Sequence, residues 1–301
     1  MRIFIPLLWF IVAILGITGF VVMLFIIFNP GFQYVDSAYT INNDIASSFG
    51  SYFGGFIGTI FAFISTLLIV ITLLKQNLEN RKKQTESNFF KMLDYHNENV
   101  KQLDVYHIIE GKEGGKGKRA FIIFKMQIRE LIKILNEINT NFNFNLSKIE
   151  IADIAYISFY YGIDDEWSVF SIEKLNQYER KEEIFTAIKE KVEINDKKIG
   201  RTNQTSVSSY YRNLYNAVKL IDEDKSFTKR EKKKYIKILR AQLSNPELYV
   251  FFFNILSRFG TKWRDKDYIT KYGLLTNIPL GYTEDYNPKD FFQIKYEEDE
   301  L

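Results

Sequence analysis

Cysteine and histidine, two residue types central to metal and acid–base chemistry, are scarce in this sequence. The chain has no cysteine and only two histidines, His96 and His107. They stand eleven positions apart, instead of the three or four that place two side chains on one face of a helix. We therefore expect no metal site and no other cofactor. Residues 111–119, GKEGGKGKR, also lack the Ser or Thr that follows the lysine of a phosphate-binding P-loop.

A nuclease site is poorly supported by the same residues. Helical defence ribonucleases often place a histidine five to seven positions after an arginine, and neither histidine here has such an arginine. Acidic runs such as 164–165 or 222–224 could bind Mg²⁺, but runs of this kind are typical of solvated turns. Enzymatic activity therefore stays open, and we favour its absence.

Polar side chains within apolar helical stretches are the remaining candidates for a site. One interpretation is helix capping and interhelical pairing, including a buried Arg–Glu pair, and we favour it. The alternative is a binding pocket in the part of the chain beyond residue 75, lined by two tyrosines and these polar groups. The candidate binding residues are His96, Tyr210, Tyr211, Arg212, Arg240, Gln242, Asn245, Glu247 and Asn254.

Two long charge-free stretches come first in the chain, at residues 3–28 and 49–74. As a helix, each would be roughly 39 Å long, which exceeds the ~30 Å hydrocarbon core of a bilayer. A cleaved signal peptide would normally have a shorter apolar region. We therefore predict a transmembrane helical hairpin in residues 1–74, followed by a cytoplasmic helical domain in residues 75–301.

The basic residues that flank these stretches predict an orientation. The connecting loop, residues 29–48, holds Asp36 and Asp44 but no Lys or Arg. Arg2 precedes the first stretch, and four Lys or Arg residues follow the second within residues 75–83. The positive-inside rule then places both termini in the cytoplasm. We expect a multi-pass protein of the cell (inner) membrane, with the lipid bilayer as a partner.

Gly50, Gly54 and Gly58 form a strip of small residues in the second stretch. Such a strip lets another helix approach closely. The neighbouring helix could be the first stretch of the same chain, where Gly16 and Gly19 offer a second small surface. It could equally be a second copy of the chain. The three glycines are therefore our candidates for oligomerisation.

Beyond residue 75, apolar residues recur at helical spacing, and alternation typical of strands is scarce. This predicts an all-α fold, with the second stretch continuing as a helix to about residue 104. Residues 111–119 are expected to be a flexible loop. Residues 248–256 are apolar but too short for a third span, so we expect a core helix there. Helices are predicted over residues 121–138, 147–162, 181–192, 210–222, 228–243 and 246–260.

Four motifs in the chain resemble one family. They are FFKMLDYHNENV at 89–100, GKRAF at 117–121, YYRNLYNAVKLID at 210–222 and YIKILRAQLSNPELYVFFFNILS at 235–257. With the two charge-free stretches, they resemble the phage abortive infection protein family of the C type, over about residues 50–280. The resemblance implies bacterial defence that stops a phage infection at the cost of the host cell. Relatives carry a histidine where this chain has Ser209, and often a polar ring residue where it has Asn216, so His-dependent chemistry is not expected there.

Together, these features predict a membrane-anchored antiphage protein. Its cytoplasmic domain would bind a signal, and the protein would act through assembly or membrane damage. A membrane-tethered nuclease and a non-toxic scaffold of a membrane complex are the alternatives. A homo-oligomer and a phage-derived or host protein trigger stay open as partners. The net charge of +3, with both signs interspersed, disfavours a nucleic acid partner without ruling it out.

Overall fold

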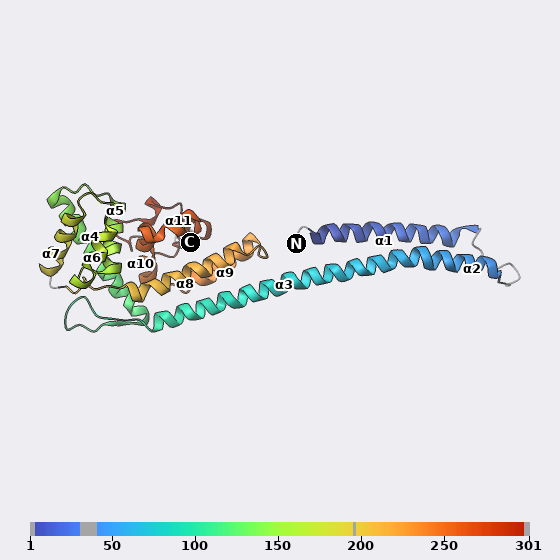
Figure 1. Ribbon diagram of the computed structural model, residues 1–301, viewed down its shortest axis with the longest axis horizontal. Helices are drawn as coiled ribbons and strands as arrows, with labels where there is room; N and C mark the ends of the chain where they lie inside the picture. Colours follow the sequence, from blue (N-terminus) through green and yellow to red (C-terminus); the bar gives the residue numbers. More distant parts are fainter. Residues whose placement is uncertain (1–3, 31–40, 195–196, 298–301) are drawn as a thin grey trace. The chain divides into compact units, whose positions relative to one another are not determined.

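The computed structural model describes residues 4–30, 41–194 and 197–297, without the side chains of 165–168 (Figure 1). Helices make up 74% of the structure and strands 2%, so the prediction of an all-α fold is confirmed. Contacts divide the chain into two units, Met1–Glu86 and Ser87–Leu301. The boundary between the units falls within the longest helix, α3 (Gly58–Lys101).

The first unit is a helical hairpin. It consists of α1 (Phe4–Phe28), α2 (Asn43–Tyr52), the π-helical turn η2 (Phe53–Ile57) and the beginning of α3. α1 runs alongside η2 and the first part of α3 (Figure 1). Gly19 allows the close approach, because a Cβ there would lie 3.2 Å from the Ile60 side chain. The hairpin is therefore held by apolar contact between its two arms.

Both arms of the hairpin are long and apolar enough to cross a membrane. The most apolar 18-residue windows have mean hydropathies of 3.0 and 2.6, and only 11% of each window is buried. A core helix of a soluble protein would be mostly buried, so these helices instead present their apolar side chains outward. Arg2 and Asp36, which enter the orientation argument, lie outside the described residues.

The glycine strip consists of Gly50, Gly54 and Gly58. Gly54 lies within the π-helical turn, and the other two glycines lie on either side of it. A Cβ added at any of these three glycines would meet no described atom of another segment within 4 Å. The Thr59 hydroxyl donates a hydrogen bond to the Gly55 carbonyl oxygen, which satisfies a backbone acceptor within the turn. The strip is thus an open surface, whereas Gly19 lies at a close contact between the arms.

The second unit begins with the last part of α3 and a small hairpin. β1 (Asp104–Val105) pairs antiparallel with β2 (Gly115–Lys116). The 3₁₀ turn η3 (Gly117–Arg119) follows. The remaining elements are α4 (Ala120–Phe142), α5 (Lys148–Tyr161), α6 (Asp165–Lys174), α7 (Lys181–Ile194), α8 (Gln204–Glu223), α9 (Lys229–Arg240), α10 (Asn245–Leu256), η4 (Arg258–Gly260), α11 (Thr261–Asp265), α12 (Tyr268–Tyr272) and η5 (Pro288–Asp290).

All the predicted helices are confirmed, with shifted ends. α8 begins six residues earlier than expected, because Val207 packs on the same buried face as Tyr210. The prediction of a flexible loop at 111–119 is wrong in its second half, where β2 and η3 form. α6 was missed, because its acidic beginning is typical of a turn.

α10 is the centre of the core. Its ten consecutive residues from Glu247 to Leu256 are all buried, which confirms a core helix there and excludes a third span. α10 ends at Leu256 and not at Gly260. Gly260 has a different role, since a Cβ there would overlap the Ile255 backbone and prevent η4 from packing on α10.

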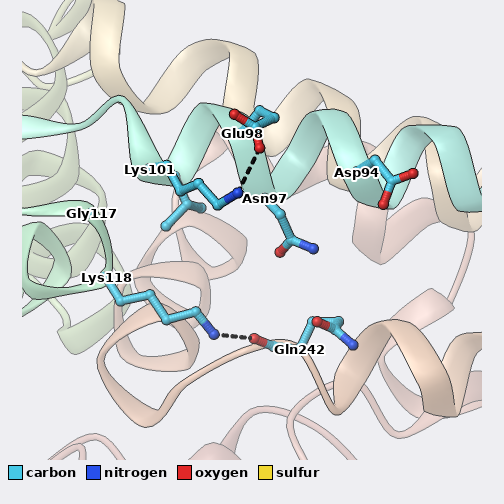
Figure 2. Close-up of a pocket in the computed structure, with 8 residues that line it drawn as sticks. Asp94, Asn97, Glu98, Lys101, Gly117, Lys118 and Gln242 are labelled. Carbon is cyan, nitrogen blue, oxygen red and sulfur yellow. Dashed lines mark hydrogen bonds and ion pairs between the residues drawn. The ribbon is translucent and has the colours of Figure 1, made fainter.

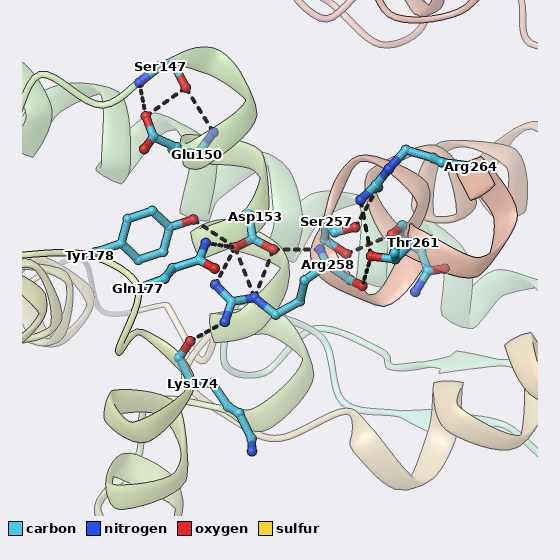
Figure 3. Close-up of polar contacts among 11 residues, drawn as sticks. Ser147, Glu150, Asp153, Lys174, Gln177, Tyr178, Ser257, Arg258, Thr261 and Arg264 are labelled. Atoms are coloured by element: carbon cyan, nitrogen blue, oxygen red, sulfur yellow. Dashed lines mark hydrogen bonds and ion pairs between the residues drawn. The ribbon is translucent and has the colours of Figure 1, made fainter.

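A buried ion pair that the sequence analysis did not anticipate joins α5 to η4 (Figure 3). The Asp153 carboxylate, 5% exposed, accepts hydrogen bonds from Nη2 of Arg258 at 2.6 Å and from the Arg258 backbone nitrogen at 2.7 Å. The Tyr178 hydroxyl donates to the same carboxylate at 2.7 Å. Arg258 in turn donates to the Lys174 carbonyl oxygen at the end of α6. This network therefore holds three helical elements together.

We expect Asp153→Ala to destabilise the protein by about 3–5 kcal/mol, because it leaves the Arg258 guanidinium partly buried without its counter-charge. The free energy of unfolding, measured by denaturant titration in detergent, checks this. The matched control is Asp104→Ala, which removes an exposed ion pair with Lys116 (3.1 Å) and should change little. Equal effects of the two substitutions would contradict the assignment. Asp153→Asn gives a milder version if the alanine variant does not fold.

Candidate functional site

Three of the sequence motifs meet around one cavity of the second unit. This polar cavity has a volume of about 410 Å³ (Figure 2). It is lined by α3, by η3 and by the turn between α9 and α10. The lining residues are Asp94, Asn97, Glu98, Val100, Lys101, Gly117, Lys118 and Gln242. Segments that are more than 120 residues apart in the chain thus contribute to a single surface.

The charges around the polar cavity nearly balance. Glu98 and Lys101 form an exposed ion pair at 2.6 Å, and the Lys118 ammonium donates to the Gln242 carbonyl oxygen at 3.0 Å. Figure 2 shows Asn97 projecting from α3 into the space above Lys118 and Gln242. The groups offer donors and acceptors of both signs, an arrangement suited to binding a polar ligand.

Three buried residues, His96, Tyr210 and Glu247, form what we call the His96 stack. The His96 ring lies 4.4 Å from the Tyr210 ring, and the Tyr210 hydroxyl donates to Oε1 of Glu247 at 3.1 Å. Oε2 of Glu247 accepts from the Ser244 backbone nitrogen at 2.8 Å, which closes a capping box at the start of α10. Neither ring nitrogen of His96 has a hydrogen-bond partner among the described residues. The stack thus ties α3, α8 and α10 together.

Burial fixes the protonation of the His96 stack. Burial, with the nearby Lys118 charge, lowers the pKa of His96 to about 4, so the ring is neutral at physiological pH. Burial, and then the Glu247 carboxylate, raises the pKa of Tyr210 well above its ordinary value, so its hydroxyl remains a donor. A neutral, buried histidine supplies no imidazolium for acid catalysis.

A second cavity, of about 190 Å³, contains other predicted candidates. It brings together Tyr211, Arg212 and Asn254, and the Asn254 amide donates to the Tyr156 hydroxyl at 2.9 Å. The adjacent rings of Tyr210 and Tyr211, 4.9 Å apart, connect this aromatic cavity to the His96 stack. Its lining residues are Tyr160, Ser208, Tyr211, Arg212, Tyr215, Asn254, Phe259, Lys262 and Trp263.

The remaining candidates, Arg240 and Asn245, line neither cavity. Nη1 of Arg240 donates to the Gly273 carbonyl oxygen at 3.0 Å, and Asn245 is an exposed residue at the start of α10. The expected buried Arg–Glu pair does not form at Arg240 and Glu247, because Tyr210 and Ser244 donate to the Glu247 carboxylate. Arg258, which is partly buried, pairs instead with the buried Asp153.

Several residues of the aromatic cavity were missed from the sequence. Ser208, Phe259, Lys262 and Trp263 had no feature that set them apart, and Tyr160 and Tyr215 were assigned only to helices. A usable signal was the concentration of cations and rings in RFGTKWR at 258–264.

The acidic residues form no group of three that could hold a metal ion among the described residues. Asp222 accepts hydrogen bonds from Lys271 and Tyr272, so it stabilises the contact of α8 with α12.

Residues 202–282 match the family model described as "Putative phage abortive infection protein". This abortive-infection segment covers 81 of the 301 residues, from just before α8 to beyond α12. The resemblance is confirmed for the motifs at 210–222 and 235–257, whereas those at 89–100 and 117–121 lie outside the match. No curated protein and no solved structure matches the chain. Of the candidate binding residues, His96 alone lies outside the abortive-infection segment.

We expect acidification to destabilise the folded protein through His96. The unfolded chain takes up a proton near pH 6.5, whereas folded His96 does so near pH 4, so stability falls as the pH drops through this window. The loss at the acidic end would be up to roughly 3 kcal/mol. Unfolding titrations between pH 7.5 and 4 measure it as the difference between the wild type and His96→Phe, which keeps a ring against Tyr210. His107→Asn is the control and should follow the wild type. Parallel profiles for the wild type and His96→Phe would contradict the prediction.

Proposed function

We propose that this protein is a membrane-anchored antiphage protein whose second unit senses a signal. The observation that carries the proposal is the family match over residues 202–282, which supports a general role in phage defence. The matched segment contains the buried helix α10 and most residues of the aromatic cavity. A defence protein must change state when infection begins, and a cavity in this segment offers a place for a signal to act.

Anchoring in the cell membrane is supported by the exposed apolar surface of the first unit. The two arms are buried over only 11% of their most apolar windows, an exposure that hydrocarbon would cover. The basic residues at 75–83 and the absence of Lys and Arg in 29–48 favour cytoplasmic termini. In this orientation the second unit faces the cytoplasm, where phage components are made.

We favour assembly of several chains in the membrane as the response to the signal. Neither arm carries an Asp, Glu, Lys, Arg or His between residues 4–28 or 49–74, so a single hairpin offers no ion path. Several hairpins could associate along the glycine strip, which is open in the described structure. A signal that promotes association would then permeabilise the membrane.

Phage infection of bacteria that express the protein tests the proposal. We expect lower plating efficiency than in empty-vector cells, and loss of membrane potential in infected cells before phage burst, followed with a potential-sensitive dye. Uninfected expressing cells are the control and should keep their potential. Protection with an intact potential would refute membrane damage, and prior degradation of RNA or DNA would favour the nuclease alternative. Absence of protection against a broad panel of phages would refute the antiphage role.

We expect Gly54→Leu and Gly58→Leu together to reduce self-association, because the added side chains separate helices that would meet at the strip. Light scattering in detergent would detect a shift toward the 35.6 kDa monomer. Gly16→Leu is the matched control, since this glycine also has open space around it but lies on α1. Unchanged mass in the double variant would exclude the strip as the interface.

A further inference from the structure

The walls of the aromatic cavity are two pairs of rings. Tyr215 of α8 and Trp263 of α11 lie 5.2 Å apart, and Tyr160 of α5 and Phe259 of η4 lie 4.5 Å apart. Among the described ring contacts, none joins one pair to the other, and all four residues line the cavity. The rings meet at 86° in the first pair and at 43° in the second, so their faces point in several directions. A lining with so many aromatic faces suits a planar ring, because every such ring can stack on one of them.

The charge of the lining selects an anion. Arg212 and Lys262 are both exposed at this cavity, and none of its nine lining residues is acidic. A bare aromatic cage would favour a cation, but two adjacent positive charges repel one. A guanidinium beside an ammonium is instead well suited to a phosphate group. The polar cavity differs in this respect, since Asp94 and Glu98 offset its two lysines.

The buried hydroxyl of Tyr211 lies beside the aromatic cavity. The Tyr211 side chain is 7% exposed, and its hydroxyl makes no hydrogen bond of ordinary geometry among the described residues, although it lies near Tyr156. Buried hydroxyls normally have a partner, because losing hydrogen bonds to water is costly. Because the Tyr211 hydroxyl oxygen is out of reach of solvent, the polar side chains that a bound ring could meet are Ser208 and Asn254.

The volume limits the size of the bound group. At about 190 Å³, the cavity is smaller than the ~300–1,000 Å³ of sites that enclose a drug-sized ligand. A single ring system fits, and the rest of the ligand must extend outward past the exposed Arg212 and Lys262. The ligand therefore combines a planar heteroaromatic ring with an attached anionic group.

We propose that the aromatic cavity binds a nucleotide unit, with the base between the two pairs of rings and the phosphate on Arg212 and Lys262. Eight of the nine lining residues, all except Tyr160, lie in the abortive-infection segment. The binding itself stands on the cavity; only its role as the signal in defence rests on the proposed function. The lining includes no histidine or carboxylate, so we assign the cavity binding of the unit and no cleavage step.

Calorimetry on the full-length protein in detergent tests this binding directly. The probes are AMP, GMP, CMP and UMP, with adenosine and inorganic phosphate to separate the contributions of base and phosphate. We expect at least one mononucleotide to bind more tightly than adenosine and phosphate do. Arg212→Gln with Lys262→Gln should weaken it by about tenfold or more, since each charge-assisted bond is lost. The charge-matched control, Arg230→Gln with Lys237→Gln on exposed positions of α9, should leave the affinity unchanged.

A second series distinguishes a free nucleotide from a nucleotide within a strand. Short single-stranded RNA that binds more tightly than mononucleotides, with a steeper salt dependence, would identify a strand as the source of the unit. Ser208→Ala tests a polar contact to the base without loss of a ring and should weaken base-dependent binding alone. No binding of any probe at millimolar concentration, or equal affinity in the Arg212/Lys262 variant, would overturn the proposal. Nucleotide binding without phage protection would preserve this inference and refute the proposed function.

Discussion

The structure of the second unit depends on the complete burial of α10. A helix with ten consecutive buried residues has no solvent to satisfy its polar groups, so each must find a partner inside the protein. At the amino end of α10, the Glu247 carboxylate accepts hydrogen bonds from the Ser244 backbone nitrogen and the Tyr210 hydroxyl. Further along, the Asn254 amide donates to the Tyr156 hydroxyl. At the carboxyl end, the backbone nitrogen of Arg258 donates to Asp153. Apart from Ser244, these partners belong to α5 and α8, so the demand for hydrogen bonds fixes where those helices lie.

The same constraint shapes the aromatic cavity. Phe251 of α10 stacks on Tyr211 at 5.8 Å and meets Trp263 edge-on at 4.9 Å, so the core supports two of the lining rings from behind. Asn254 reaches the cavity from the same helix. A ligand there would contact side chains whose positions are set by α10. A shift of those rings would therefore displace α10. Glu247 of α10 contacts Tyr210, which packs on His96, so the displacement would extend to both residues.

The sequence predicted most of the helices, which depend on nearby residues, and missed the contacts between residues far apart in the chain. Apolar spacing located α4, α5 and the helices from α7 to α10, because a helix buries residues three and four apart. β1 and β2 were missed, since two-residue strands give no alternation to detect. Glu247 and Asn254 were recognised as polar groups in an apolar helix, but their partners lie 37 and 98 residues away. The pairing of Asp153 with Arg258, 105 residues apart, and the aromatic cavity depend on tertiary packing of five elements.

The π-helical turn η2 changes the positions of the strip's glycines around the helix axis. In a regular α-helix, residues four apart drift sideways by about 40° per step, because each residue turns by about 100°. Gly50, Gly54 and Gly58 would then wind away around the helix. A π turn takes more residues per revolution, so the step through η2 turns back against that drift and returns Gly58 toward the line of Gly50. The π-helical turn thus brings the three glycines closer to one line along the helix than a regular α-helix would.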